Sequence, residues 1–342
     1  MKKLGLVGVG AIAQTYLKAL ETASFARITA VADLRADAAR GAAEAHRATA
    51  YASHVEMAEQ AGLDAVIVST PPSTHPEIAR AFLERGIPVL VEKPVAIDEA
   101  GARAILSAGQ RSGTFVTMAS KFRYVDDVIR ARALISAGML GDIQLMENVF
   151  AAPVKMVGRW NADPKVSGGG VLVDNGTHSV DIVRYLLGPI TEVDTIIVDT
   201  FDKGLAVDDN VQMFVATETG AKVRIDLSWT FDKQLANYIS LYGTHGVAHI
   251  GWKESRYKLA GASDWVVFGQ GYDKFAAFRA NVENFCQAID GRAPSLITFD
   301  DALASVEAIR AAYQSAVLRA PVRLVAKSIE PVAADMRNGI HA

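Results

Sequence analysis

The chain has 342 residues, a mass of 36.5 kDa and a formal net charge of -3, with 50% hydrophobic and 21% charged residues. This length predicts two domains, because a single hydrophobic core seldom grows so large. The balanced composition disfavours a disordered chain, a collagen and a basic nucleic-acid-binding protein. Apolar runs fall short of the roughly 18 residues that a membrane-spanning helix needs. We therefore expect neither a nucleic-acid partner nor a membrane partner.

Residues 1 to about 120 alternate short apolar runs with alanine-rich helical segments, which is the order of a βαβ fold. The expected strands are residues 4–9, 28–32, 65–69, 89–92 and 115–119. The expected helices are residues 11–20, 36–45, 55–61, 75–85 and 98–112, the last with Asp98 as its N-cap. Because the strands are apolar on both faces, they predict a buried, doubly wound parallel α/β sheet.

The first expected strand ends in a glycine turn, residues 8–13, with the sequence GVGAIA. Gly8 permits a tight turn, Gly10 leaves room for a pyrophosphate, and Ala13 allows close packing of the helix. Asp33 ends the second expected strand, where a carboxylate should hold the adenosine ribose hydroxyls. The pattern therefore predicts a dinucleotide site that favours NAD, while Arg35 leaves NADP possible.

The N-terminus and the single cysteine both indicate a cytoplasmic protein. The apolar run after Met1 imitates a short signal peptide, but its glycines fit a strand and turn better, so we expect the mature protein to start near Met1. Cys286 cannot close a disulfide within the chain and lies among apolar residues at helical spacing. We expect it to be buried, in a reducing compartment.

After about residue 125 the rhythm changes, which indicates a second domain over residues 123–342 and a first domain over 1–122. A helix is expected at 126–137, followed by a strand, a glycine-rich loop at 168–170 and another helix. Polar and apolar residues alternate over 222–229, which predicts a strand with one polar face toward water or a neighbouring subunit. Two helices, 275–289 and 299–317, should close the fold.

The helix after the glycine-rich loop carries a polar stripe on an apolar background. Helical spacing places four side chains on this stripe: Asp174, His178, Asp181 and Tyr185. A solvated helix face is usually rich in Lys and Glu, and this one has neither, which favours a functional site. The i,i+4 spacing should bring Asp174 within about 6 Å of His178, so that the carboxylate orients the imidazole.

Lys93 supplies the second element of the expected site, because it follows an expected strand at the carboxyl edge of the parallel sheet. Oxidation of a secondary alcohol needs a base for the hydroxyl proton, and a histidine suits that exchange. A fixed ammonium stabilises the developing alkoxide. We therefore expect His178 as the acid/base, Asp174 as its orienting partner and Lys93 as the electrostatic stabiliser.

Together these residues resemble the Gfo/Idh/MocA family of glucose-fructose oxidoreductases and inositol dehydrogenases. The likeness rests on Gly8-x-Gly10-x-x-Ala13, Thr70-Pro71-Pro72 with His75, Glu92-Lys93-Pro94, and Asp174-x-Gly176-x-His178-x-x-Asp181. It implies an N-terminal Rossmann domain and a C-terminal α/β domain for substrate binding and oligomerisation, built on an open, mainly antiparallel sheet that often supports dimers or tetramers.

The resemblance and the residues together give the expected contacts. Those to the nucleotide are Gly8, Gly10, Ala11, Ile12, Asp33, Leu34, Arg35, Ser69, Thr70, Pro71, His75, Glu92 and Lys93. Those to the substrate are Lys93, Arg123, Trp160, Asn161, Asp174 and His178. The family has no obligatory metal, and we expect none, since His245 and His249 are too far apart along a strand to share an ion.

Three functions remain open at this point. The first is an NAD-dependent dehydrogenase acting on a secondary hydroxyl of a sugar, inositol or related polyol. The second is an NADP(H)-dependent reductase of another carbonyl or conjugated compound. The third is a non-catalytic regulator that senses the dinucleotide, which the presence of Lys93, Asp174 and His178 argues against.

Overall fold

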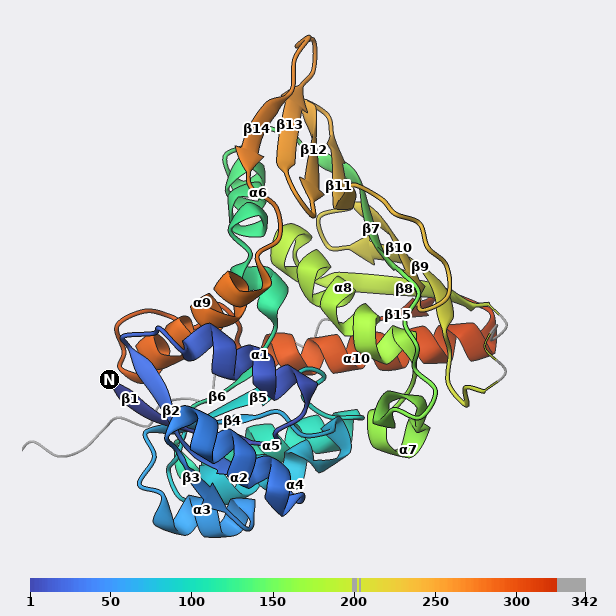
Figure 1. Ribbon diagram of the computed structural model, residues 1–342. Coiled ribbons are helices and arrows are strands. Elements are labelled where there is room, and N and C mark those ends of the chain that lie inside the picture. Colours follow the sequence, from blue (N-terminus) through green and yellow to red (C-terminus); the bar gives the residue numbers. More distant parts are fainter. Residues whose placement is uncertain (199–201, 203, 325–342) are drawn as a thin grey trace, which may run out of the picture.

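The computed structural model describes residues 1–198, 202 and 204–324, and its elements form two sheets (Figure 1). The strands of the first sheet are β1 Lys2–Val7, β2 Ala26–Ala32, β3 Thr49–Tyr51, β4 Ala65–Val68, β5 Val89–Glu92 and β6 Val116–Ala119. They are all parallel, in the order β3-β2-β1-β4-β5-β6. Every residue of β4, β5 and β6 is buried, which confirms the doubly wound sheet expected from their apolar sequences.

Sequence patterns missed β3, because it has only three residues and lies at the sheet edge. The helices of this half are α1 Ala11–Leu20, α2 Ala36–His46, α3 His54–Gln60, η1 Pro72–Thr74, α4 His75–Leu83 and α5 Glu99–Ser112. The Asp98 carboxylate accepts the Gly101 N–H at 2.8 Å, so it is the N-cap of α5 as predicted.

The strand order reverses between β1 and β4, and this reversal determines where a ligand can bind. The connections that leave these two neighbouring strands run to opposite sides of the sheet, which opens a crevice at their carboxyl ends. The glycine turn follows β1, and residues 69–71 follow β4. Both expected nucleotide-binding turns therefore meet at this crevice.

The second sheet has nine strands among the described residues, in the order β14-β13-β12-β11-β7-β10-β9-β8-β15. Their bounds are β7 Ile143–Ala151, β8 Ile190–Ile197, β9 Asn210–Thr217, β10 Lys222–Ser228, β11 Asn237–Gly243, β12 Gly246–Gly251, β13 Ser255–Leu259, β14 Val266–Gly269 and β15 Val322–Arg323. Only β7 and β10 pair in parallel within this described sheet, so it is mainly antiparallel, as expected.

Helices cover one face of this second sheet (Figure 1). Between β6 and β8 the chain forms, in addition to β7, the helices η2 Lys121–Tyr124, α6 Asp126–Ser136, η3 Trp160–Ala162, α7 Pro164–Ser167 and α8 Val171–Leu187. The predicted alternation along β10 holds for Val223 and Ile225, which are buried, and for Arg224, which is exposed. Asp226 departs from it, because this buried carboxylate forms an ion pair with Lys233.

The last two helices, α9 Lys274–Ile289 and α10 Phe299–Leu318, return to the first sheet. Figure 1 shows α9 beside α1 and α10 running toward the second sheet. Phe278, Phe285 and Cys286 pack with the core of the first half, and Leu303 packs on its other side. The expected boundary at 122/123 falls inside η2, between the last strand of the first sheet and the first strand of the second, and the first core includes residues of the C-terminal helices.

Cys286 is 1% exposed, which confirms the prediction that the sole cysteine is buried. Among the described helices, none combines the length and the apolar character needed to cross a bilayer.

Candidate active site

The glycine turn after β1 fits the close approach of a phosphate. Gly8 has φ +85°, and a side chain there would also lie 2.9 Å from the Thr70 nitrogen. At Gly10 a Cβ would meet no atom within 4 Å, so the space beside the start of α1 is open. No side chain caps that helix start, which leaves the amides of Ala11 and Ile12 available to an anion. These features fit a bound pyrophosphate.

Asp33 is held where a ribose would need it. Its carboxylate accepts the Val9 N–H at 2.7 Å and the Arg35 N–H at 2.8 Å. Partial burial opposes ionisation, but the hydrogen bonds from Arg35 and Val9 prevail and lower the pKa of Asp33. The Arg35 guanidinium is paired with this carboxylate, and Leu34 beside it is 99% exposed. The structure therefore places an ionised acid beside the glycine turn.

The turn after β4 is joined to the glycine turn by Ser69, whose hydroxyl donates to the Gly8 carbonyl at 2.9 Å. Thr70 and Pro71 follow at the edge of the crevice, where they remain partly exposed.

His75 has no exposed surface, which contradicts the expectation that it contacts the nucleotide. Its Nε2 lies 2.8 Å from the Thr70 carbonyl and its Nδ1 lies 3.0 Å from the Pro94 carbonyl. Burial lowers the pKa of His75 to about 4. The neutral imidazole donates its single N–H to one of these two carbonyls and lies buried between the turn after β4 and the segment after β5.

At the end of β5, Glu92 is also committed within the protein. It accepts the Tyr16 hydroxyl at 2.7 Å and the Lys93 N–H at 3.0 Å, and burial raises its pKa. Glu92 therefore braces the backbone of Lys93, while both residues line a small recess together with Ile12.

Helix α8 begins at Val171, three residues before the first residue of the polar stripe, and Asp208 caps this start. The Asp208 carboxylate accepts the Gly170 N–H at 3.0 Å and the Leu172 N–H at 2.8 Å. A Cβ at Gly170 would lie 1.8 Å from the Asp208 carbonyl oxygen, so only glycine fits here. The glycine-rich loop thus lets a distant acid initiate the helix that carries His178.

Lys93 and α8 meet across the two halves of the molecule. The Lys93 ammonium forms an ion pair with the Asp174 carboxylate and donates to the Asp174 carbonyl at 3.0 Å. Asp174 therefore holds Lys93, and in the described structure it forms no hydrogen bond with His178. The expected pairing of Asp174 with His178 is therefore wrong in this respect, because the Asp174 carboxylate pairs with Lys93 instead.

His178 is 6% exposed and lies at the wall of the site. Its Nδ1 is buried and has no hydrogen-bond partner among the described residues, while the Phe122 ring meets the imidazole edge to face at 5.0 Å. Burial, together with the nearby ammonium groups of Lys93 and Lys121, lowers the pKa of His178 well below its usual range. The imidazole is therefore neutral at pH 7 and able to accept a proton.

A cavity of about 900 Å³ joins these groups. The cavity is lined by Ile12 of the glycine turn, by Lys93 directly after β5, and by Asp174 and His178 of α8. Its other side is formed by the second sheet, by the loop 229–236 and by aromatic rings. The rings in the lining are Phe122, Phe150, Trp252 and Tyr272. Lys93 from the first half and His178 from the second half therefore line the same cavity.

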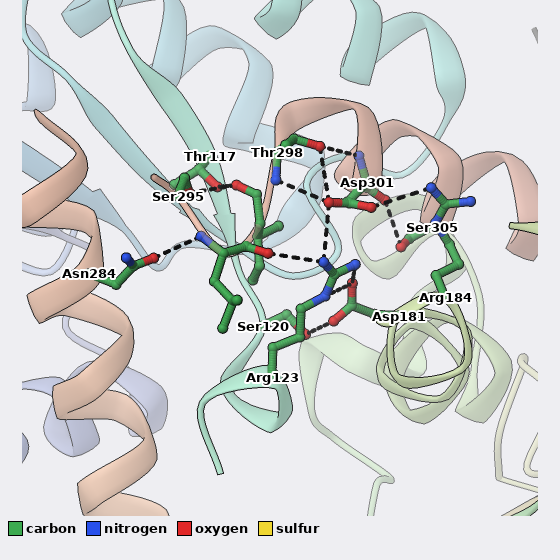
Figure 2. A network of polar contacts seen from close by, with 12 residues as sticks. Thr117, Ser120, Arg123, Asp181, Arg184, Asn284, Ser295, Thr298, Asp301 and Ser305 are labelled. Carbon is green, nitrogen blue, oxygen red and sulfur yellow. Dashed lines mark hydrogen bonds and ion pairs between the residues drawn. The ribbon is translucent and has the colours of Figure 1, made fainter. Parts of the chain in front are cut away.

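Arg123 lies away from this cavity, contrary to the expectation that it contacts substrate. Its side chain is 4% exposed and pairs with Asp181 and Asp301, as Figure 2 shows. Asp181 is fully buried and also accepts the Ser120 hydroxyl at 2.5 Å. The polar stripe of α8 therefore divides, because its first turns face the cavity and Asp181 joins a buried ion-pair network.

The last residue of the stripe and two of the expected substrate contacts also lie outside the cavity lining. Tyr185 is buried, with the guanidinium of Arg132 4.3 Å from the centre of its ring. Trp160 and Asn161 belong to η3, where Trp160 is 45% exposed. In the described part of the chain, no group of three or more His, Cys, Asp or Glu residues is arranged to hold a metal ion.

Sequence reasoning missed several residues that the structure brings to the site. Lys121 lines both the cavity and the recess, and its place directly after β6 at the carboxyl edge of the sheet was a usable signal. Trp252 and Tyr272 come from loops beside the second sheet, and no local pattern marks them as site residues.

A doubly wound sheet, a glycine turn with open space beside it, and a second domain that closes over the carboxyl edge define a two-domain dinucleotide-binding protein. The model of the NAD-binding Rossmann fold of the GFO_IDH_MocA oxidoreductases matches residues 2–120, and the GFO/IDH/MocA C-terminal domain matches residues 128–249. The two models cover more than half of the chain, which therefore belongs to the Gfo/Idh/MocA oxidoreductase family.

Individual relatives agree with this assignment over nearly the whole chain. The rhizopine catabolism protein MocA of Rhizobium meliloti is 29% identical and spans 91% of this chain and 93% of its own. The inositol 2-dehydrogenase of Rhizobium meliloti strain 1021 is 25% identical, over 92% and 96%. Levoglucosan dehydrogenase in complex with NADH and levoglucosan superposes with a TM-score of 0.86 at 20% identity, over 95% and 99%, and so supports the fold.

Proposed function

We propose that this protein is an NAD-dependent dehydrogenase that transfers a hydride between nicotinamide and a secondary hydroxyl of a sugar, inositol or related polyol. The observation that carries the proposal is that Lys93 and His178, from different halves of the chain, line one cavity with Ile12 of the glycine turn. Relatives named as inositol dehydrogenases support this substrate class.

His178 accepts the hydroxyl proton in the oxidation direction. Its lowered pKa keeps the imidazole neutral before the reaction, so one ring nitrogen keeps a lone pair that can accept the proton. A buried base also gives up its proton readily, so His178 can protonate the alkoxide in the reverse direction. Phe122 against the ring restricts its orientation.

Lys93 stabilises the charge that develops on the substrate oxygen. Its ion pair with Asp174 fixes the ammonium in the cavity wall, so little reorganisation is needed when the alkoxide forms. Asp174 thus acts through Lys93 in this proposal. When bound, NAD supplies the hydride acceptor.

The preference for NAD rests on Asp33. Its ionised carboxylate would repel the 2'-phosphate of NADP, and Arg35 is already paired with it. No side chain caps the start of α1, and the space beside Gly10 is open, so the amides of Ala11 and Ile12 can bind the pyrophosphate.

Turnover measurements test the proposal. The purified protein should form NADH from NAD with at least one member of a sugar and polyol panel, and His178→Ala should reduce kcat by about 100-fold or more. NAD affinity should change little, because His178 lies on the second domain. NAD binding without NADH formation across the panel would refute the dehydrogenase, and an undiminished kcat in the variant would remove His178 from the mechanism.

We also propose a homodimer or homotetramer formed through the face of the second sheet that its helices leave open. Three exposed apolar side chains on strands of this sheet support this surface: Leu145 of β7, Ile196 of β8 and Phe214 of β9. Light scattering should return at least twice the chain mass of 36.5 kDa, and a monomer would contradict the assembly.

The buried lone thiol of Cys286 agrees with our proposal of a cytoplasmic location.

A further inference from the structure

Lys121 is a cavity residue with no role in the steps above. It follows β6 directly, at the same carboxyl edge of the sheet that presents Lys93. Its side chain lines the main cavity and the small recess, and in both it shares the lining with Lys93, His178 and Ile12. A substrate that reaches His178 therefore lies within the field of two ammonium groups.

The two lysines differ in how their charges are balanced. The Lys93 ammonium is paired with Asp174, whereas the Lys121 ammonium lies near aromatic rings, 5.2 Å from the centre of Phe122 and 5.8 Å from that of Tyr272. Among the described residues no carboxylate lies close enough to form an ion pair with Lys121, although the charges of Glu92 and Asp174 act on it from farther away and raise its pKa in part. Glu92 contributes a carboxylate to the recess, and this group already accepts hydrogen bonds from the Tyr16 hydroxyl and the Lys93 N–H.

An ammonium without a paired carboxylate is costly to bury. Consistent with this cost, burial and the positive charge of Lys93 lower the pKa of Lys121 to about 8. An anion that entered the cavity would supply the missing partner and recover part of the cost. The site is therefore electrostatically complementary to a negatively charged ligand.

The backbone on both sides of Lys121 is fixed. Ser120 donates its hydroxyl to Asp181 at 2.5 Å, and Arg123 donates its Nε–H to the same carboxylate at 2.9 Å (Figure 2). Asp181 stands on α8, three residues after His178. The buried carboxylate thus holds the segment of Lys121 in register with the helix that carries the proposed base.

The wider cavity has the same sign of charge. Its cationic lining residues are Lys93, Lys121, Lys233, Lys253 and Arg256, and its anionic lining residues are Asp174, Asp232 and Glu254. Lys93 is paired with Asp174, and Lys233 is paired with Asp226 outside the lining, so the other lining side chains carry one positive charge in excess. An excess of cations along a cleft concentrates anions at its mouth and steers them inward. Its volume of about 900 Å³ leaves room for a substituted monosaccharide beside the nicotinamide.

We propose that Lys121 binds an anionic group on the substrate, a carboxylate or a phosphate, while His178 and Lys93 act on a hydroxyl of the same molecule. The substrate class is then an acidic polyol, such as an aldonate, a uronate or a sugar phosphate. This inference rests on the proposed dehydrogenase function, because it assigns the cavity to the substrate.

Binding to the NADH complex tests the proposal without requiring turnover. Quenching or enhancement of bound-NADH fluorescence would give dissociation constants for matched pairs: D-gluconate with D-glucitol, D-glucuronate with D-glucose, and D-glucitol 6-phosphate with D-glucitol. A hydrogen bond between charged groups predicts that the acidic member of at least one pair binds roughly 10- to 100-fold more tightly. A preference in the gluconate or glucuronate pair would indicate a carboxylate ligand, and a preference in the glucitol 6-phosphate pair would indicate a phosphate ligand.

Two variants of Lys121 assign the preference to this side chain. Lys121→Met keeps the length and removes the charge, so it should weaken acid binding by about 10-fold or more and leave neutral binding within about 2-fold. Lys121→Arg should retain most of the preference. Lys155→Met, which removes an exposed lysine outside the cavity lining, is the matched control and should behave as the unmodified protein.

Equal binding of acidic and neutral members in every pair would overturn the proposal. The proposal would also be overturned if Lys121→Met weakened the binding of acidic and neutral ligands equally while its NADH affinity and circular dichroism stayed unchanged. A comparable loss of acid preference in Lys155→Met would overturn it as well. Failure of the proposed function would give a different result: acidic ligands would bind selectively, but no ligand would yield NADH from NAD. Turnover of neutral polyols without acid preference would instead reject only the role of Lys121.

Discussion

Replacement of Asp181 by Asn should destabilise the protein far more than loss of a surface ion pair. Asp181 is fully buried and Arg123 is 4% exposed, so the amide would leave the guanidinium with Asp301 as its remaining carboxylate partner, which is 20% exposed and is shared with Arg184. Removal of one partner of a buried pair costs about 3–5 kcal/mol. Because Asp301 retains part of the compensation, we expect a loss near the lower limit, about 3 kcal/mol.

Urea unfolding at pH 7, followed by circular dichroism and tryptophan fluorescence, measures this loss. The control is Asp126→Asn, which breaks the surface pair with Arg130, whose side chains are 68% and 58% exposed, and should cost less than about 1 kcal/mol. The double variant Arg123→Met with Asp181→Leu should regain stability relative to Asp181→Asn, because neither charge remains buried. Equal unfolding midpoints for Asp181→Asn and Asp126→Asn would refute the reasoning.

Two further predictions concern the nucleotide-binding half. Asp33→Ser removes the charge that repels a 2'-phosphate, so the NADP/NAD ratio of kcat/KM should rise by about 10-fold; an unchanged ratio would remove Asp33 from cofactor selection. His75 has a pKa of about 4 when folded and about 6.5 when unfolded, so the unfolded chain binds the extra proton first and stability should fall as pH drops from 6.5 to 4, by up to about 3 kcal/mol. In His75→Gln this part of the pH dependence should be absent in urea titrations, and an identical pH profile would contradict the assignment.

The nucleotide-binding half was readable from sequence because its signals are local. Gly8 and Gly10 lie within one turn, and Asp33 ends the next strand, so a strand, a turn and a helix sufficed to place them. Lys93 was likewise marked by its position after a buried strand. His75 was misplaced because a motif gives its spacing but not its burial.

The α8 stripe shows where local reasoning reaches its limit. Helical periodicity correctly placed His178 on a polar face, since that face depends only on 3.6 residues per turn. It could not show that Lys93 takes the Asp174 carboxylate, or that Asp181 turns to Arg123, because those partners lie 81 and 58 residues away along the chain.

The sequence by itself determined the doubly wound sheet, the glycine turn, and the choice of Lys93 and His178, because each depends on short-range spacing and on strand order. Only the tertiary structure decided which charges neutralise one another and which remain available to a ligand. That outcome depends on distances between residues far apart in the chain, such as Lys93 and Asp174, and on the burial that makes a charge without an ion-pair partner, such as that of Lys121, costly.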